Sequence, residues 1–345
     1  MKILSLGKQE YSRLVRDDCI YVDKTRQISE LLRTGSAWFL SRPRRFGKSL
    51  LVNTMKEIFL GNRDLFAGTW IHDKIDWKPS PVIKLDFNLV PWRTQGLTAA
   101  LLKTIHGIAR ANDVPLTSEG LDEALTELIV ELSKKSGPVA ILVDEYDKPI
   151  SDNIEDIPRA EENREILKSF YSGLKSLDND IRFLFITGVS KFSKVSLFSD
   201  LNHLTDLTIS RQAATLLGYT HEEVEEYFGE YLDAAAEALE LSGQELLDRM
   251  AKMYNGYSWN GSDFVYNPFS LQNFLHARQF NHFWFATGTT SWLVKAIQTA
   301  GKLPQDVSPI EVTESFFDKF DLRSMDLASL LFQTGYLTIK RIDGD

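Results

Sequence analysis

The fold of this chain is decided by one stretch, Ser41-Arg42-Pro43-Arg44-Arg45-Phe46-Gly47-Lys48-Ser49. It follows a short apolar run, 37–40, and leads into a helix-like run, 50–55. A strand, a bend and a helix in this order form the context in which Gly-Lys-Ser binds nucleotide phosphates. Backbone N–H groups at the start of such a helix point toward an anion, Lys48 adds positive charge, and the Ser49 hydroxyl holds Mg²⁺. The stretch therefore predicts a phosphate-binding loop.

This loop departs from the general pattern, which has Gly where Arg42 stands. Because Pro43 restricts the residue before it to an extended conformation, the chain should enter the loop less tightly than usual. Two other interpretations stay open at this point. Gly-Lys-Ser is short enough to occur by chance, and Arg42, Arg44 and Arg45 could form a solvated basic turn. A second motif has to decide between them.

Composition places the chain among ordinary globular proteins. It has 345 residues, of which 43% are hydrophobic and 25% charged. The formal net charge of −9 argues against a surface that grips nucleic acid along its whole length. Cys19 is the single cysteine, so no internal disulfide can form, and no apolar run is long enough to span a bilayer. We therefore expect a cytoplasmic protein with no membrane partner.

The second motif is an apolar run, 139–143, that ends in Asp144 and Glu145. A strand that is apolar throughout is buried on both faces, as in a parallel sheet covered by helices. Carboxylates at its C-terminal end project into the crevice where open α/β sheets bind ligands. Asp144 is then expected to hold Mg²⁺ with Ser49, while Glu145 polarises the water that attacks the γ-phosphate. The two motifs together favour the nucleotide-binding interpretation.

Three further strands are expected, over Pro81–Phe87, Ile181–Gly188 and His203–Ile209. Thr187 stands near the end of the 181–188 strand, where one group of nucleotidases carries a polar sensor of the γ-phosphate. Alternatively, Thr187 satisfies a backbone group where the chain turns. Arg211, just after the last of these strands, either reaches a phosphate of this subunit or a neighbouring one, or lies at the surface.

Two other segments have simpler interpretations. The opening segment through Thr25 is expected to be a loop, followed by a helix over 28–32. Within it, Tyr21 either stacks on the nucleotide base or packs the segment onto the core. Asp147 and Lys148 are assigned to a turn and an ion pair rather than to catalysis.

A second, mainly helical domain is expected from residue 216. Thr220 to Glu223 form a capping box, and Asn-Gly pairs within 255–261 predict a small hairpin with 264–266 as its return strand. Asn267 and Pro268 start another helix. A last helix over 325–332 leads into a strand over 336–339 that has no partner after it. We therefore expect the sequence to be part of a longer protein.

Four segments together carry a family resemblance: Tyr21-Val22-Asp23-Lys24-Thr25, Arg42 to Ser49, Val143-Asp144-Glu145-Tyr146-Asp147-Lys148-Pro149 and Tyr266-Asn267-Pro268-Phe269-Ser270. They resemble the bacterial family called AAA-ATPase-like, over nearly the whole chain. The form Arg-Pro-Arg-Arg-Phe-Gly-Lys-Ser is distinctive of that family, so Arg42 in place of Gly fits it. Members are similar to signalling and archaeal-type P-loop ATPases. Many carry a C-terminal nuclease-like domain of the PD-(D/E)XK type, which this sequence lacks.

The expected fold is an α/β P-loop domain over residues 1–215, with a parallel five-stranded sheet in the order 5-1-4-3-2, and a helical lid-like domain over 216–345. The family resemblance adds expectations about ligands and partners. It implies ATP and Mg²⁺ as ligands and a link to nucleic acid through the absent C-terminal domain; a homo-oligomer is also possible. The expected catalytic residues are Lys48, Glu145 and Thr187, and the expected metal ligands are Ser49 and Asp144. The expected nucleotide-binding residues are Arg42, Arg44, Arg45, Phe46, Gly47, Lys48, Ser49 and Leu50.

Two rival functions stay open from the sequence. One is a switch that binds ATP without hydrolysing it. The absence of the first Gly of the general motif is compatible with this function. The other is a nucleic-acid-binding regulator in which Arg42, Arg44 and Arg45 face a phosphate backbone. The Asp144-Glu145 pair argues against the second. ATP hydrolysis, as a regulatory or motor activity linked to nucleic-acid processing, is the function that the sequence favours.

Overall fold

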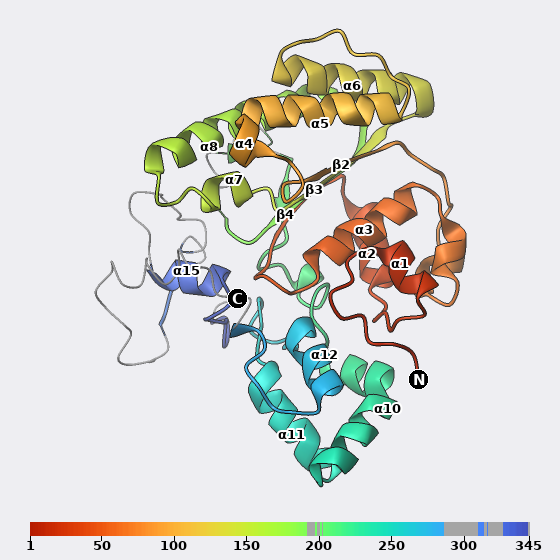
Figure 1. Cartoon of the computed structure of the whole chain (residues 1–345), viewed down its shortest axis with the longest axis vertical. Helices are drawn as coiled ribbons and strands as arrows, with labels where there is room; N and C mark the ends of the chain where they lie inside the picture. Colours follow the sequence, from red (N-terminus) through yellow and green to blue (C-terminus); the bar gives the residue numbers. More distant parts are fainter. Residues whose placement is uncertain are drawn as a thin grey trace.

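A computed structural model describes residues 1–191, 197–198, 201, 203–285, 310–313, 316 and 327–343. Its centre is a five-stranded parallel sheet in the order β2-β3-β4-β1-β5, which is 5-1-4-3-2 when read from the other edge (Figure 1). The strands are β1 Ala37–Ser41, β2 Val82–Asp86, β3 Val139–Asp144, β4 Ile181–Gly188 and β5 Thr205–Asp206. The α/β class and the parallel sheet expected from the sequence are thus confirmed.

Each central strand supplies side chains to two cores, because successive residues of a strand point to opposite faces. In β3, Ile141 and Val143 join one core, while Ala140 and Leu142 join the other. Figure 1 shows α5, α6 and α8 on one face of the sheet and α1, α2 and α3 on the other. This double covering explains why β3 is fully buried and apolar up to Val143, its last residue before Asp144.

The helices of the sheet domain have the following bounds. Those on the face of the phosphate loop are α1 Tyr11–Arg16, α2 Thr25–Thr34 and α3 Lys48–Phe59, with short 3₁₀ turns at Arg63–Phe66 and Trp70–Asp73. Those on the other face are α4 Trp92–Gln95, α5 Leu97–Ala111, α6 Leu121–Ser136, α7 Lys148–Ser151 and α8 Ile157–Ser172, followed by a 3₁₀ turn at Gly173–Leu177. One more 3₁₀ turn, Arg211–Ala213, follows β5.

A helical region follows the sheet. It contains α10 His221–Leu239, α11 Gly243–Tyr254 and α12 Pro268–Ala277, which share one apolar core. The capping box at Thr220 and Glu223 and the Asn267 cap of α12 are both present, as expected. The expected hairpin is reduced to a single antiparallel bridge, Tyr257 to Val265. The last described helix, α15 Leu327–Gln333, packs against the sheet core; its expected start at Met325 lies outside the described residues.

Three local expectations are wrong. The opening segment contains a helix, α1, which packs Tyr11 and Leu14 into the protein. The fifth strand shrinks to Thr205–Asp206, because the Asp206 carboxylate accepts from the Thr208 N–H and turns the chain. Residues 336–339 form no strand: the Thr338 hydroxyl, not its backbone, accepts from the Ser258 N–H.

Candidate functional site

The phosphate loop lies between β1 and α3, at the carboxyl end of the central strands (Figure 1). Gly47 caps α3 with φ 94°, a left-handed conformation that favours glycine. Arg45 also has a positive φ, 68°, so the loop holds a second left-handed residue that is not glycine. The first N–H groups of α3 have no acceptor within the helix, which is the geometry that suits an anion.

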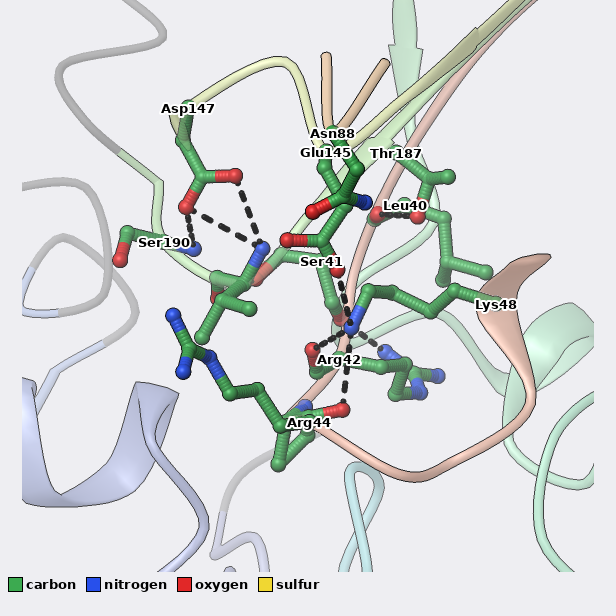
Figure 2. A network of polar contacts seen from close by, with 12 residues as sticks. Leu40, Ser41, Arg42, Arg44, Lys48, Asn88, Glu145, Asp147, Thr187 and Ser190 are labelled. Carbon is green, nitrogen blue, oxygen red and sulfur yellow. Dashed lines mark hydrogen bonds and ion pairs between the residues drawn. The ribbon is translucent and has the colours of Figure 1, made fainter. Parts of the chain in front are cut away.

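Lys48 is buried, and its ammonium binds the loop itself. Its Nζ donates to the carbonyl of Arg42 at 3.0 Å and to that of Pro43 at 3.1 Å. The Glu145 carboxylate lies 3.9 Å away (Figure 2). The ammonium therefore stands between the loop and the end of β3, where the two sequence motifs were expected to meet.

Arg42 does not occupy the position expected of a phosphate ligand. Its guanidinium is 1% exposed and donates to the carbonyls of Ser41, Thr208 and Ala213. It lies 4.0 Å from the ring centre of Trp259, and burial lowers its pKa to about 9. The cavity beside it has a volume of about 10 Å³, room for one water molecule. Arg42 thus holds β1, the turn after β5 and the 258–261 segment together.

The other loop residues differ in how far their side chains are exposed. Phe46 is buried away from solvent, with its ring packed edge-on against Tyr257 and Trp259. Arg45 is exposed, and its guanidinium lies 5.0 Å from the ring centre of Phe269. Arg44 is half-buried, and Figure 2 shows its side chain extending on the side of the loop where Asp147 and Ser190 lie. Ser49 and Leu50 lie in the first turn of α3, both partly exposed.

Asp144 ends β3 as a buried carboxylate. Neither of its oxygens has a hydrogen-bond partner. Its pKa is raised to about 6, chiefly by burial and also by the adjacent Glu145 charge, while the Ser49 hydroxyl, close by but outside good hydrogen-bond geometry, opposes the rise. Such a group is costly unless a ligand satisfies it.

Glu145 follows directly in a strained conformation. Its φ is 55°, in the left-handed region that non-glycine residues rarely adopt. Strain of this kind costs about 1–3 kcal/mol and is concentrated at functional sites. Because the left-handed turn comes immediately after a strand, it separates the direction of the Glu145 side chain from that of Asp144. Two adjacent carboxylates can therefore serve different partners.

Thr187 does not stand free at the end of β4. Its hydroxyl is fully buried and donates to the carbonyl of Leu40 at 2.7 Å, so it joins β4 to β1. This geometry corresponds to the second interpretation, that Thr187 satisfies a backbone group. We therefore assign Thr187 no role as a sensor of the γ-phosphate.

Asp147 has a structural role that sequence reasoning missed. Its carboxylate accepts from the N–H groups of Val189 and Ser190, which fixes the turn after β4 (Figure 2). Burial raises its pKa to about 6. Lys148 forms an ion pair, as expected, and its partner is Asp152 at 3.5 Å. In the sequence, the one indication of the role of Asp147 was that it lies two residues after Glu145, close to the acidic motif.

Tyr21 and Arg211 can also be placed. Tyr21 packs edge-on against Tyr11, at 4.9 Å between ring centres, and its ring belongs to the core around α3. This is the packing interpretation of the two considered. Arg211 is exposed at the start of a 3₁₀ turn.

The residues present fit a magnesium ion held jointly with a nucleotide. Mg²⁺ prefers oxygen ligands and usually takes one or two from the protein, with water and phosphate oxygens completing its shell. The unpartnered Asp144 carboxylate and the nearby Ser49 hydroxyl supply that set. In the described part of the chain, no group of three or more His, Cys, Asp or Glu side chains could hold a metal without such help.

Fold and site together define the class: an α/β protein whose phosphate loop and acidic strand end face one another across the carboxyl edge of a parallel sheet. Comparison with known proteins identifies the family. Residues 5–198 match the family described as "Predicted AAA-ATPase", and the chain belongs to this family. The family description implies nucleotide binding.

One curated relative is similar along almost the whole chain. It is described as "Uncharacterized protein in vnfD 5'region" from Azotobacter chroococcum mcd 1, and it is 37% identical over 345 residues. The match covers 99% of this chain and 65% of the relative. Among the described residues, no helix combines the length and apolar character needed to cross a membrane.

Proposed function

We propose that this chain binds ATP together with Mg²⁺ and hydrolyses it. The observation that carries the proposal is the pairing of a loop lysine with an acidic strand end: Lys48 Nζ lies 3.9 Å from Glu145, next to the unpartnered carboxylate of Asp144. A lysine, a metal ligand and a water-orienting carboxylate at a helix N-terminus are the parts that phosphoryl transfer to water requires. The family description supports this assignment.

Each residue has a separate task in the proposed reaction. The N–H groups at the start of α3 and the Lys48 ammonium bind the phosphates, after Lys48 leaves the carbonyls of Arg42 and Pro43. Ser49 and Asp144 hold Mg²⁺, which neutralises charge on the phosphate oxygens. Glu145 orients a water molecule and accepts its proton. The water attacks the γ-phosphorus, and the bond to the bridging oxygen breaks, which releases ADP and phosphate.

Phosphate release under saturating Mg·ATP tests this function directly. Glu145→Gln should keep ATP binding and reduce phosphate release by about a hundredfold or more, because the amide cannot accept the proton. Lys48→Ala should lose binding itself. Glu165→Gln, on the exposed surface of α8, serves as the matched control and should match wild type. If Glu145→Gln releases phosphate at the wild-type rate, Glu145 is not the base and the hydrolytic assignment fails.

A switch that binds ATP without turning it over is the second candidate. The bonds of Lys48 to two loop carbonyls favour it, because they must break before the lysine can reach a phosphate. A rise in melting temperature with Mg·ATP, without phosphate release by wild type, would select the switch. Measurement with and without DNA or RNA also tests the link to nucleic-acid processing; a rate that neither polymer changes argues against that link.

A further inference from the structure

The phosphate loop is surrounded by aromatic side chains from the helical region, far away in the sequence. Phe46 lies 4.8 Å from Tyr257 and 5.3 Å from Trp259, both measured between ring centres. Phe46 and Trp259 share a small buried cluster with Phe332 at the end of α15. The loop thus has an apolar core of its own, made of residues that come more than 200 positions later.

Two further contacts hold the backbone of the loop. The indole N–H of Trp284 donates to the carbonyl of Arg44 at 3.1 Å. Gly335 packs directly on Pro43: a Cβ at position 335 would lie 2.9 Å from the ring of that proline. Together with the stacking of Arg42 on Trp259 at 4.0 Å, these contacts reach three consecutive residues of the loop, 42–44, in addition to Phe46.

These contacts compensate for the unusual composition of the loop. A glycine-rich phosphate loop wraps its ligand through backbone freedom alone. Here Arg42 takes the position of the first glycine, and Arg45 adopts a positive φ that costs an ordinary residue about 1–2 kcal/mol. The packing of the helical region offsets that cost. The same two residues, Arg42 and Pro43, offer the carbonyls that bind Lys48.

We propose that Trp259 and Trp284 are positioning residues for the phosphate loop: they fix the carbonyls and N–H groups around Lys48, and they couple nucleotide affinity to the packing of the helical region. This rests on the proposed nucleotide binding. Neither tryptophan needs to touch the nucleotide. Trp259 acts through the Arg42 side chain, and Trp284 acts through the Arg44 carbonyl.

Three variants test the proposal. Trp284→Phe removes the indole N–H and keeps an aromatic ring; Trp259→Leu removes the stacking surface, and Trp259→Phe retains part of it. Trp92→Phe is the matched control, because Trp92 is equally buried and also stacks with an arginine, Arg93 at 4.4 Å, but belongs to the core around α5. Three quantities are measured: amide hydrogen exchange of residues 43–49 without nucleotide, the dissociation constant for Mg·ATP, and the melting temperature.

Trp284→Phe and Trp259→Leu should speed exchange of the loop amides and weaken Mg·ATP binding by about tenfold, with Trp259→Phe in between. Trp92→Phe should lower the melting temperature without either effect. The proposal is overturned if Trp284→Phe folds as wild type does and leaves both loop exchange and affinity unchanged, or if Trp92→Phe weakens binding equally. The exchange measurement needs no nucleotide. Suppose that wild type binds no ATP, but that loop exchange is faster in Trp284→Phe than in wild type. The proposed function and the coupling are then refuted, while the contribution of Trp284 to the loop is established.

Discussion

The end of β3 and the phosphate loop face each other across one site, and each buries a charged side chain. The two side chains differ in how many hydrogen-bond partners they have within the protein. At the end of β3, the Asp144 carboxylate is buried with both oxygens unpartnered. In the loop, the Arg42 guanidinium is buried just as deeply, but it donates to three backbone carbonyls and stacks on Trp259. The Asp144 oxygens have no partner within the protein, whereas the terminal nitrogens of Arg42 are all bound to it.

This difference separates motif residues whose polar atoms are bound within the protein from motif residues whose polar atoms are not. A charged side chain in a motif contributes to binding only if its polar atoms are still free once the chain has folded. Arg42 and Thr187 both occupy motif positions, yet the two terminal nitrogens of Arg42 and the Thr187 hydroxyl donate to protein carbonyls, and of these donors only Arg42 Nε is left without a partner. Asp144 has no such commitment. The comparison predicts that substitutions on the two sides will change stability in opposite directions.

The largest effect is expected from Arg42→Ala. The change leaves the carbonyls of Ser41, Thr208 and Ala213 without their donor and removes the packing on Trp259. Since each buried unsatisfied group costs about 1–3 kcal/mol, the free energy of unfolding should fall by roughly 3 kcal/mol or more. Urea unfolding measures this loss.

Arg93→Ala is a suitable control for Arg42→Ala. Arg93 also stacks on a tryptophan, Trp92, but its side chain is 55% exposed and its ion pair with Asp152 lies at the surface. Its loss should cost less than about 1 kcal/mol. Equal losses for the two variants would contradict the structural role of Arg42.

The sheet and its active edge could be predicted from the sequence because they follow from local patterns. The apolar run 139–143 requires burial on both faces, and a parallel strand buried in this way places Asp144 and Glu145 at the carboxyl edge. Lys48 reaches the same edge because α3 starts directly after β1. The bounds of β4, Ile181–Gly188, also followed from its apolar pattern.

The partners of individual side chains could not be predicted, because they depend on contacts that no local pattern encodes. Two of the three carbonyls that bind Arg42 come from residues 166 and 171 positions later, and its stacking partner is Trp259. Likewise, the Thr187 hydroxyl meets Leu40 only because β4 lies beside β1. The sequence predicted that the loop and the acidic end of β3 lie at one edge of the sheet, but it could not tell which of their polar groups lack partners within the protein.

Asp144→Asn should have the opposite sign to Arg42→Ala when magnesium and nucleotide are absent. The pKa of Asp144 is about 6 in the folded protein against an ordinary 3.8, so the folded state binds this proton more tightly than the unfolded chain does. The free energy of unfolding therefore falls as pH rises from about 4 to about 6 and stays lower above that window. The asparagine removes this loss, which amounts to about 3 kcal/mol at most. At about pH 7.5 the variant should melt higher than wild type; near pH 4 it should not.

The same variant should gain no stability from Mg·ATP and should lose phosphate release. Asp147→Asn is its matched comparison, since burial also raises the pKa of Asp147 to about 6. However, the Asp147 carboxylate accepts from the N–H groups of Val189 and Ser190, so its replacement should lower the melting temperature. If both variants melt higher than wild type at about pH 7.5, unpartnered oxygens are not what distinguishes the two carboxylates.

The smallest effect is expected from Arg45→Ala. This variant tests whether the Arg45 guanidinium only packs against the protein or also binds the nucleotide. Arg45 is exposed, and its stacking on Phe269 at 5.0 Å should contribute about 0.5 kcal/mol to the free energy of unfolding. If this stacking is its main role, the dissociation constant for Mg·ATP should change less than about threefold. Arg44→Ala, whose side chain lies on the Asp147 side of the loop in Figure 2, is the comparison. A tenfold loss of affinity in Arg45→Ala alone would place its guanidinium with the ligand-binding charges, beside Lys48.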